Sequence, residues 1–163
     1  MKAEHTLVIA IEDISTIHCV GKEATHIAIE VGAKRLVLLH VLDQHPLSGA
    51  AVAMSGYYMP IGESPEDGAA LLKRAEAAIE AEFDRRRTPR PEIELLVGQG
   101  NPSEAIEDVV RDYGAEDVVM GARHRHVFGR LMYSDVRAHL KCLDAHHIHI
   151  APLQEPTITR HKS

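Results

Sequence analysis

Apolar residues in this chain form short continuous runs that alternate with longer stretches of helical period. Apolar side chains at consecutive positions are typical of strands that are covered on both faces, as in a parallel sheet. Each run is short and is bounded by charged, polar or turn residues, which fits a strand better than a helix. The five strands predicted in this way are residues 7–11, 35–41, 92–97, 117–121 and 147–152.

The stretches between these runs carry apolar residues at steps of three and four, which indicates amphipathic helices. The first ends before Gly32, and the third begins with Asn101 as N-cap, has Pro102 at its first position and stops at Gly114. Residues 44–68 lack a sustained period and are predicted to form a long loop, a length that is usually functional. The four predicted helices are residues 15–31, 69–87, 102–113 and 134–143.

Five strands that alternate with four helices predict an α/β fold, a doubly wound parallel sheet with helices on both faces. No internal repeat divides the chain, so we expect one domain. Ligands of such sheets bind beyond the carboxyl ends of the strands, where the strand order reverses. Function is therefore sought in the loops after Ile11, Val41, Val97 and Met120.

The amino-acid composition limits the binding partners and the cellular compartment that we expect. Eighteen Lys and Arg against 24 Asp and Glu leave a net charge of −6, which attracts neither nucleic acid nor an anionic membrane. No stretch approaches the roughly 20 apolar residues of a membrane span. Cys19 and Cys142 lie far apart and match no metal spacing, so we expect buried thiols in a reducing, cytoplasmic compartment.

Two short motifs suggest chemistry that the rest of the chain does not support. Glu12 and Asp13 after the first strand resemble the metal-binding acids of response-regulator receivers, but the third strand lacks the following Asp and the fifth the following Lys. The segment GQGNPSEA lacks the Gly-Lys-Ser/Thr of a phosphate loop and is better explained as a helix cap. Solvated acids at a strand end remain the structural alternative for Glu12.

The segment after the fourth strand, MGARHRHVFGRLMYSDVRAHL, resembles the universal stress protein family. The similarity covers nearly the whole chain, because LVIAIEDIS, RLVLLHVLD, GNPSEAIEDVVRDYGAEDVVMG and HHIHIAPL stand where that family has related segments. The resemblance implies an adenine-nucleotide-hydrolase-like sheet with strand order 3-2-1-4-5. It also implies a family domain over residues 1–153, followed by a polar tail, 154–163.

Nucleotide-binding members of that family carry Gly-x2-Gly-x9-Gly-Ser/Thr, and this chain departs from the pattern. The corresponding positions are Gly121, His124, Ser134 and Asp135, so two glycines and the hydroxyl are replaced. Glycine lets backbone amides approach phosphate oxygens closely, whereas Asp135 would place negative charge beside them. Asp135 is also a favourable residue at a helix N-terminus, which is its structural alternative.

Other positions of the family's site are retained. Asp13, in the pattern Asp-x-Ser with Ser15, matches the acid after the first strand, and Val41 matches the residue whose backbone meets adenine. Arginines at 123, 125, 130 and 137 could hold phosphate through their side chains, or form a solvated basic loop. The candidate nucleotide-binding residues are Asp13, Val41, Met120, Gly121, Arg123, His124, Ser134, Asp135 and Val136.

The resemblance leaves three hypotheses for function. The first is a regulatory stress-response module that binds ATP or AMP, with Mg²⁺ for a triphosphate, or an altered ligand between strands one and four. The second is a ligand-free interaction protein of the family's non-ATP-binding branch, which the segment RLMYS resembles. The third is weak nucleotide hydrolysis with Asp13 orienting a metal, although no catalytic set and no resident metal site is expected. The family also implies a homodimer that pairs through the last strand.

Twelve histidines give the chain an unusual response to acid, since their full protonation would move the net charge from −6 to +6. His147 and His149 share one face of the last strand, and His124 and His126 lie in the altered loop, where they could bind an anion. If the last strand forms a dimer seam, we expect the dimer to weaken below about pH 6. Packing or hydrogen bonding is the role expected for His18, His26 and His40.

Overall fold

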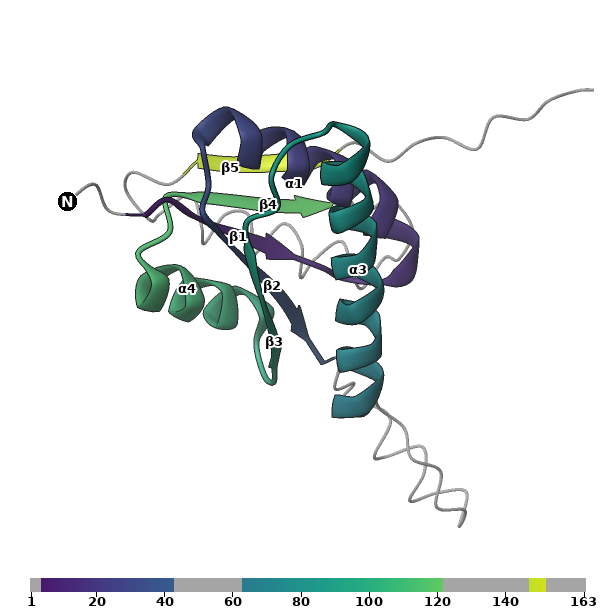
Figure 1. The fold of residues 1–163 in the computed structure, drawn as a ribbon. Helices are drawn as coiled ribbons and strands as arrows, with labels where there is room; N and C mark the ends of the chain where they lie inside the picture. Colours follow the sequence, from purple (N-terminus) through teal and green to yellow (C-terminus); the bar gives the residue numbers. More distant parts are fainter. Residues whose placement is uncertain (1–3, 43–62, 122–146, 152–163) are drawn as a thin grey trace, which may run out of the picture.

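The computed structural model describes residues 4–42, 63–121 and 147–151, and they form one five-stranded parallel sheet (Figure 1). Its strand order is β3-β2-β1-β4-β5, so the predicted fold class and order are confirmed. The order reverses between β1 and β4, where Ala10 pairs with Met120. The strands are β1 (Thr6–Ala10), β2 (Arg35–Val41), β3 (Glu92–Gly98), β4 (Asp117–Gly121) and β5 (His147–Ala151).

Helices cover both faces of the sheet (Figure 1). α1 (Ile17–Val31) and α3 (Pro65–Arg85) share one face and pack against one another, and α4 (Pro102–Tyr113) covers the other. Within the described ranges, none of these helices is both long and apolar enough to cross a membrane. The predicted helix 134–143 lies outside the described residues.

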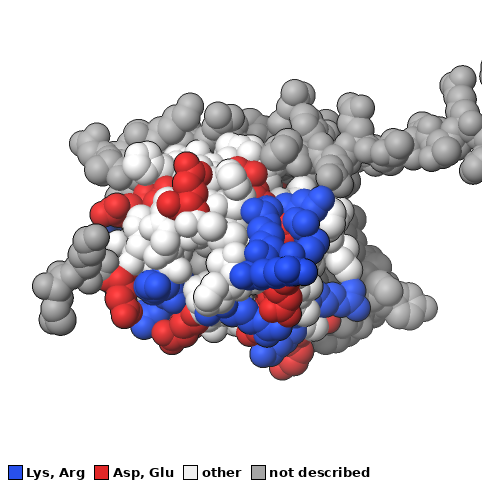
Figure 2. Space-filling view, turned by 45° about the horizontal axis from the view of Figure 1, so that its top comes forward, with Lys and Arg blue, Asp and Glu red and all other residues white. Residues whose placement is uncertain are grey.

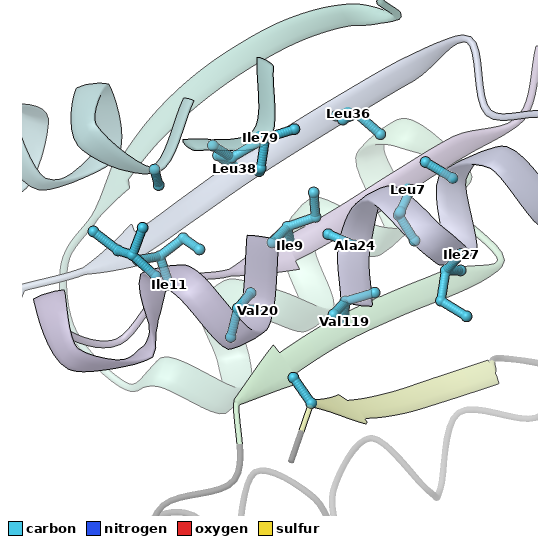
Figure 3. Close-up of a cluster of buried hydrophobic side chains, with 14 of the residues drawn as sticks. Leu7, Ile9, Ile11, Val20, Ala24, Ile27, Leu36, Leu38, Ile79 and Val119 are labelled. Carbon is cyan, nitrogen blue, oxygen red and sulfur yellow. The ribbon is translucent and has the colours of Figure 1, made fainter. Parts of the chain in front are cut away.

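The continuous apolar run of β1 fills the core on both faces. Leu7 and Ile9 lie in the cluster beneath α1 and α3 (Figure 3), whereas Val8 lies in the cluster beneath α4. All three side chains are 0% exposed, and burying each contributes about 1.5–3 kcal/mol. This two-sided burial is the reason that the sequence of β1 does not alternate.

The start of α3 corrects the predicted loop. We expected a loop to residue 68 and a helix from 69, but α3 begins at Pro65. The Ser64 hydroxyl accepts a hydrogen bond from the Asp67 amide (3.1 Å), and the Asp67 carboxylate accepts one from the Ser64 amide (3.2 Å). This capping box was readable in Ser-Pro-Glu-Asp, but Gly68 interrupts the apolar period there.

Gly68 is required where α3 passes the end of β2. A Cβ atom on it would lie 2.9 Å from Leu42 Cδ2 and 3.2 Å from His40 Cδ2. A side chain at this position would require Leu42 and His40 to shift, so glycine allows the first turn of α3 to approach the end of β2 closely. The helix also ends at Arg85, two residues before the predicted end.

All three long helices end with the same pair of backbone hydrogen bonds and a left-handed residue. Gly32 (φ 67°) and Gly114 (φ 60°) fill that position after α1 and α4, as the sequence predicts. After α3 the position holds Arg87 (φ 54°), the one non-glycine residue with positive φ in the described part of the chain. The paired bonds run there from the Thr88 amide to Phe83 O and from the Arg87 amide to Asp84 O.

We expect Arg87→Gly to raise the free energy of unfolding by about 0.5–1 kcal/mol, because glycine adopts this backbone conformation without the penalty of a Cβ. The Arg87 side chain is exposed. Urea unfolding of both proteins measures the change. Gly32→Ala is the matched control and should lower stability by about 1 kcal/mol, since no atom lies within 4 Å of the added Cβ and only the backbone conformation is affected. Equal stability of Arg87→Gly and the parent protein would contradict the expectation.

Candidate functional site

The turn after β1 positions Asp13, the first of the predicted site residues. Its Oδ1 accepts hydrogen bonds from the Ser15 amide (2.8 Å) and the Ser15 hydroxyl (2.5 Å), and the Thr16 hydroxyl donates to its carbonyl oxygen (2.9 Å). Asp13 thereby caps the short 3-10 helix η1 (Ile14–Thr16) that leads into α1. One carboxylate oxygen is committed to this turn, so the pattern Asp-x-Ser has a structural function of its own.

Gly121, at the end of β4, packs against the same turn. A Cβ atom there would lie 3.1 Å from Val20 Cγ2 and 3.3 Å from Thr16 Cβ. The absence of a side chain therefore lets β4 end directly beside the start of α1. The structure brings the Asp13 turn and Gly121 together, on the two strands between which the strand order reverses.

Two further predicted residues lie on the same edge of the sheet in different environments. Met120 is 3% exposed and belongs to the cluster beneath α4, so its side chain is part of the core. Val41 ends β2 opposite Gly98, and its half-buried side chain packs against that cluster. The other predicted site residues lie outside the described residues and are Arg123, His124, Ser134, Asp135 and Val136.

The surface carries Lys and Arg side chains gathered on one face, with Asp and Glu side chains beside them (Figure 2). At the end of α3 the arginines are paired: Arg86 Nε lies 2.9 Å from Glu82 Oε1, and Arg90 Nε lies 2.9 Å from Asp84 Oδ1. The hydrogen bond from Arg85 lowers the pKa of Glu82 to about 2, despite an opposing contribution from burial. These pairs place carboxylates beside Arg85, Arg86 and Arg90 at the helix end.

A second cluster lies at the opposite, amino edge of the sheet and was not predicted. The Asp117 carboxylate, at the start of β4, is 2% exposed and lies between two histidines. His149 Nε2 is 2.7 Å from its Oδ1, and His5 Nε2 is 2.8 Å from its Oδ2. His147 Nδ1 lies 3.4 Å from Oδ1, so the prediction that His147 and His149 share a face is confirmed.

Sequence reasoning missed Asp117 because its histidine partners are distant in the chain, and only the pairing of β4 with β5 places Asp117 opposite His147. Burial raises the pKa of Asp117, but the hydrogen bonds from His149 and His5 outweigh it, and the pKa lies below its ordinary value. No group of three or more side chains in the described ranges has a geometry suited to a metal ion.

The expectation of packing or hydrogen bonding for the three other histidines is confirmed for His40 and not for His18 and His26. His40 is 3% exposed and both ring nitrogens have partners, which confirms its expected role. His18 and His26 are exposed on α1, so the expectation of packing is wrong for them. His26 has only a loose ion pair, in which its Nε2 lies 3.8 Å from Glu30 Oε2.

The fold and the carboxyl-edge site together define a doubly wound α/β protein with a candidate ligand site at its topological switch point. The family model described as the universal stress protein family matches residues 20–140. The chain belongs to the universal stress protein family.

Solved structures of that family share the fold at low sequence identity. A universal stress protein in complex with cAMP has a TM-score of 0.59 and 19% identity, covering 94% of this chain and 100% of that chain. The universal stress protein from Archaeoglobus fulgidus in complex with dAMP has a TM-score of 0.59 and 16% identity, covering 91% and 98%. A family protein from Arabidopsis thaliana with AMP bound has a TM-score of 0.50 and 18% identity, covering 94% and 97%. No curated protein matches the chain.

We expect Asp117→Asn to lower the free energy of unfolding at pH 7 by about 1–3 kcal/mol, because two histidine donors lose a charged acceptor. A lowered folded pKa means that Asp117 stabilises the fold above its unfolded pKa and that this contribution is lost as the pH falls through the folded value. The difference between the two proteins should therefore shrink below about pH 4. Urea unfolding from pH 7 to pH 3 measures it, with exposed Asp112→Asn on α4 as control. A difference that stays constant over this range would count against the histidine–carboxylate cluster.

Proposed function

We propose that this universal stress protein is a regulatory stress-response module that binds an adenine nucleotide, or an altered ligand, between the carboxyl ends of β1 and β4. The observation that carries the proposal is the contact between the Asp13 turn and Gly121 at the point where the strand order reverses. Relatives of the same fold in complex with cAMP, dAMP and AMP support adenine as the base. We propose ATP or AMP as the ligand, with Mg²⁺ accompanying a triphosphate, and one domain over residues 1–153 with a polar tail, 154–163.

The chemistry of Asp13 assigns it to the sugar or the base rather than to phosphate. An ionised carboxylate only accepts hydrogen bonds, so it suits hydroxyl and amino donors and repels phosphate oxygens. Its Oδ1 is held by Ser15, which fixes the carboxylate plane. We propose that phosphate is held beyond Gly121 by side chains such as Arg123 and His124, in place of the backbone amides that the lost glycines would expose.

A ligand-free interaction protein is the alternative, and it is consistent with the structural roles of the two retained motif residues. Asp13 caps η1 and Gly121 packs against Thr16 and Val20, so each residue has a role that needs no nucleotide. Weak nucleotide hydrolysis has no such observation in its favour, and release of phosphate over hours that Asp13→Asn abolishes would be needed to support it.

We expect saturating ATP or AMP to raise the melting temperature. A ligand at one hundred times its dissociation constant stabilises the native state by about 2.7 kcal/mol, which corresponds to about 5–10 °C for a chain of this size. Asp13→Asn keeps the oxygen that caps η1 but removes the charge, so it should reduce the shift without unfolding the protein. Asp112→Asn on α4, at the other edge of the sheet, is the matched control and should leave the shift unchanged.

Mass spectrometry of nucleotide that co-purifies from cells identifies the ligand independently of the melting curves. Absence of any shift with ATP, AMP or cAMP, together with a purified protein free of nucleotide, would reject the binding module in favour of the interaction protein.

We further propose a cytoplasmic homodimer that pairs through β5, the edge strand of the sheet beyond β4. Edge strands carry unpaired backbone groups that a second strand can satisfy. The His147 side chain is 75% exposed, so it is accessible to a partner strand that pairs with this edge.

We expect this dimer to dissociate more readily below about pH 6, where imidazoles gain charge and repel one another across the axis. Sedimentation velocity at pH 7.5 and pH 5.5 measures it. His147→Asn should remove most of the difference, and His26→Asn on α1 should not. A monomer at both pH values would reject the dimer, and an unchanged dimer at pH 5.5 would reject the role of the histidines.

A further inference from the structure

His40 lies buried at the carboxyl end of β2 and connects two other segments. Its Nδ1 is 2.7 Å from the carbonyl oxygen of Ile11, directly after β1. Its Nε2 is 2.7 Å from Oε2 of Glu63, directly before the N-cap of α3. The His40 side chain is 4% exposed and that of Glu63 is 26% exposed. Water therefore has little access to the two ring nitrogens of His40.

The chemistry of these two partners fixes how many protons the cluster holds. A carbonyl oxygen can only accept, so Nδ1 must carry a hydrogen. An ionised carboxylate can also only accept, so the bond to Nε2 needs a second proton, either on the ring or on Glu63. The pair therefore holds one proton more than a neutral imidazole beside a carboxylate. Without it, two lone pairs would face one another at 2.7 Å.

The elements packed around His40 carry further acidic side chains. Its neighbours across the sheet are Ile11 and Val97, and Gly68 of α3 lies against its ring. The acids in the first turn of α3 are Glu66 and Asp67, and the Asp67 carboxylate is held by Ser64. Glu12 and Asp13 follow Ile11 along the chain.

We propose that His40 is a positioning residue that fixes the end of β1 and the start of α3 relative to β2, and that its bond to Glu63 requires one proton beyond the neutral ring. Ile11 stands two residues before Asp13, and His40 stands one residue before Val41, so the bonds hold the backbone that leads into two of the candidate site residues. This positioning role rests on the proposed function, whereas the proton requirement does not. The bond between Nε2 of His40 and the ionised Glu63 carboxylate is lost when that proton leaves.

The variant Glu63→Gln distinguishes the requirement for the extra proton from the contact between the two side chains. A glutamine amide can donate a hydrogen bond to Nε2 of a neutral ring that keeps its hydrogen on Nδ1, so the variant retains the contact without the extra proton. Glu66→Gln, in the first turn of α3, removes the same charge without touching His40 and is the matched control.

Nitrogen NMR of the His40 ring tests the proton requirement in the full chain without any nucleotide. We expect Nδ1 to be protonated in both proteins. In the parent protein we expect a second proton to be held on Nε2 or shared with Glu63, and to leave as the pH rises. In Glu63→Gln we expect a neutral Nδ1–H ring at every pH above the range in which imidazole gains charge. A parent ring that carries its only proton on Nε2 would overturn the proposal.

The pH dependence of the unfolding equilibrium is a second measurement, and a contact that needs no extra proton would not change it. We expect the unfolding constant of the parent protein relative to Glu63→Gln to rise about tenfold from low to high pH, as the parent loses a charge-assisted hydrogen bond. The same comparison with Glu66→Gln should show no such trend. Parallel pH profiles for the parent and Glu63→Gln would also overturn the proposal.

The affinity of the two proteins for nucleotide tests the proposed positioning role of His40. If AMP or ATP binds, we expect affinity for the parent protein to fall with rising pH and affinity for Glu63→Gln to stay level, and identical profiles would reject the positioning role. If neither nucleotide binds, the proposed function fails while the NMR result still decides the proton requirement.

Discussion

β1 is the strand on which the other elements depend. It pairs with β2 on one side and β4 on the other, and its alternate side chains enter the two cores. Its register therefore fixes both the strand order and the placement of the helices on each face. The hydrogen bond from the Ile11 amide to Leu39 O (2.8 Å) continues this pairing beyond the last residue of the strand. The turn that holds Asp13 thus begins from a backbone that is already fixed.

The sequence predicted the strands and the two glycine-terminated helices because each depends on local signals. Continuous apolar runs identify buried strands, and Gly32 and Gly114 stand where a left-handed residue is needed. The start of α3 was misplaced because Gly68 suggests a turn, whereas here it serves close packing against Leu42 and His40. A glycine that permits packing and a glycine that permits a turn have the same appearance in a sequence, and only the neighbouring elements distinguish them.

The candidate site was predictable in position but not in detail. The rule that ligands meet parallel sheets at the reversal of strand order locates Asp13, Val41 and Gly121 on one edge without coordinates. The partners of Asp13 and Gly121 depend on how α1 begins, and the resemblance to a family could not supply them. The histidines around Asp117 and the pair formed by His40 and Glu63 depend on contacts between residues far apart in the chain. Such contacts become visible only once strand neighbours are known.

Gly121 also changes how sequence comparisons within this family should be weighed. Because a Cβ atom at this position would make unusually tight contacts with Thr16 and Val20, close packing is by itself a reason for glycine here. This packing role does not depend on a bound nucleotide, so it would persist in a lineage that has abandoned nucleotides. The first glycine of the motif should then persist after the others have drifted, and its presence alone has little diagnostic value for binding. A survey that scores motif positions equally would count such lineages as binders.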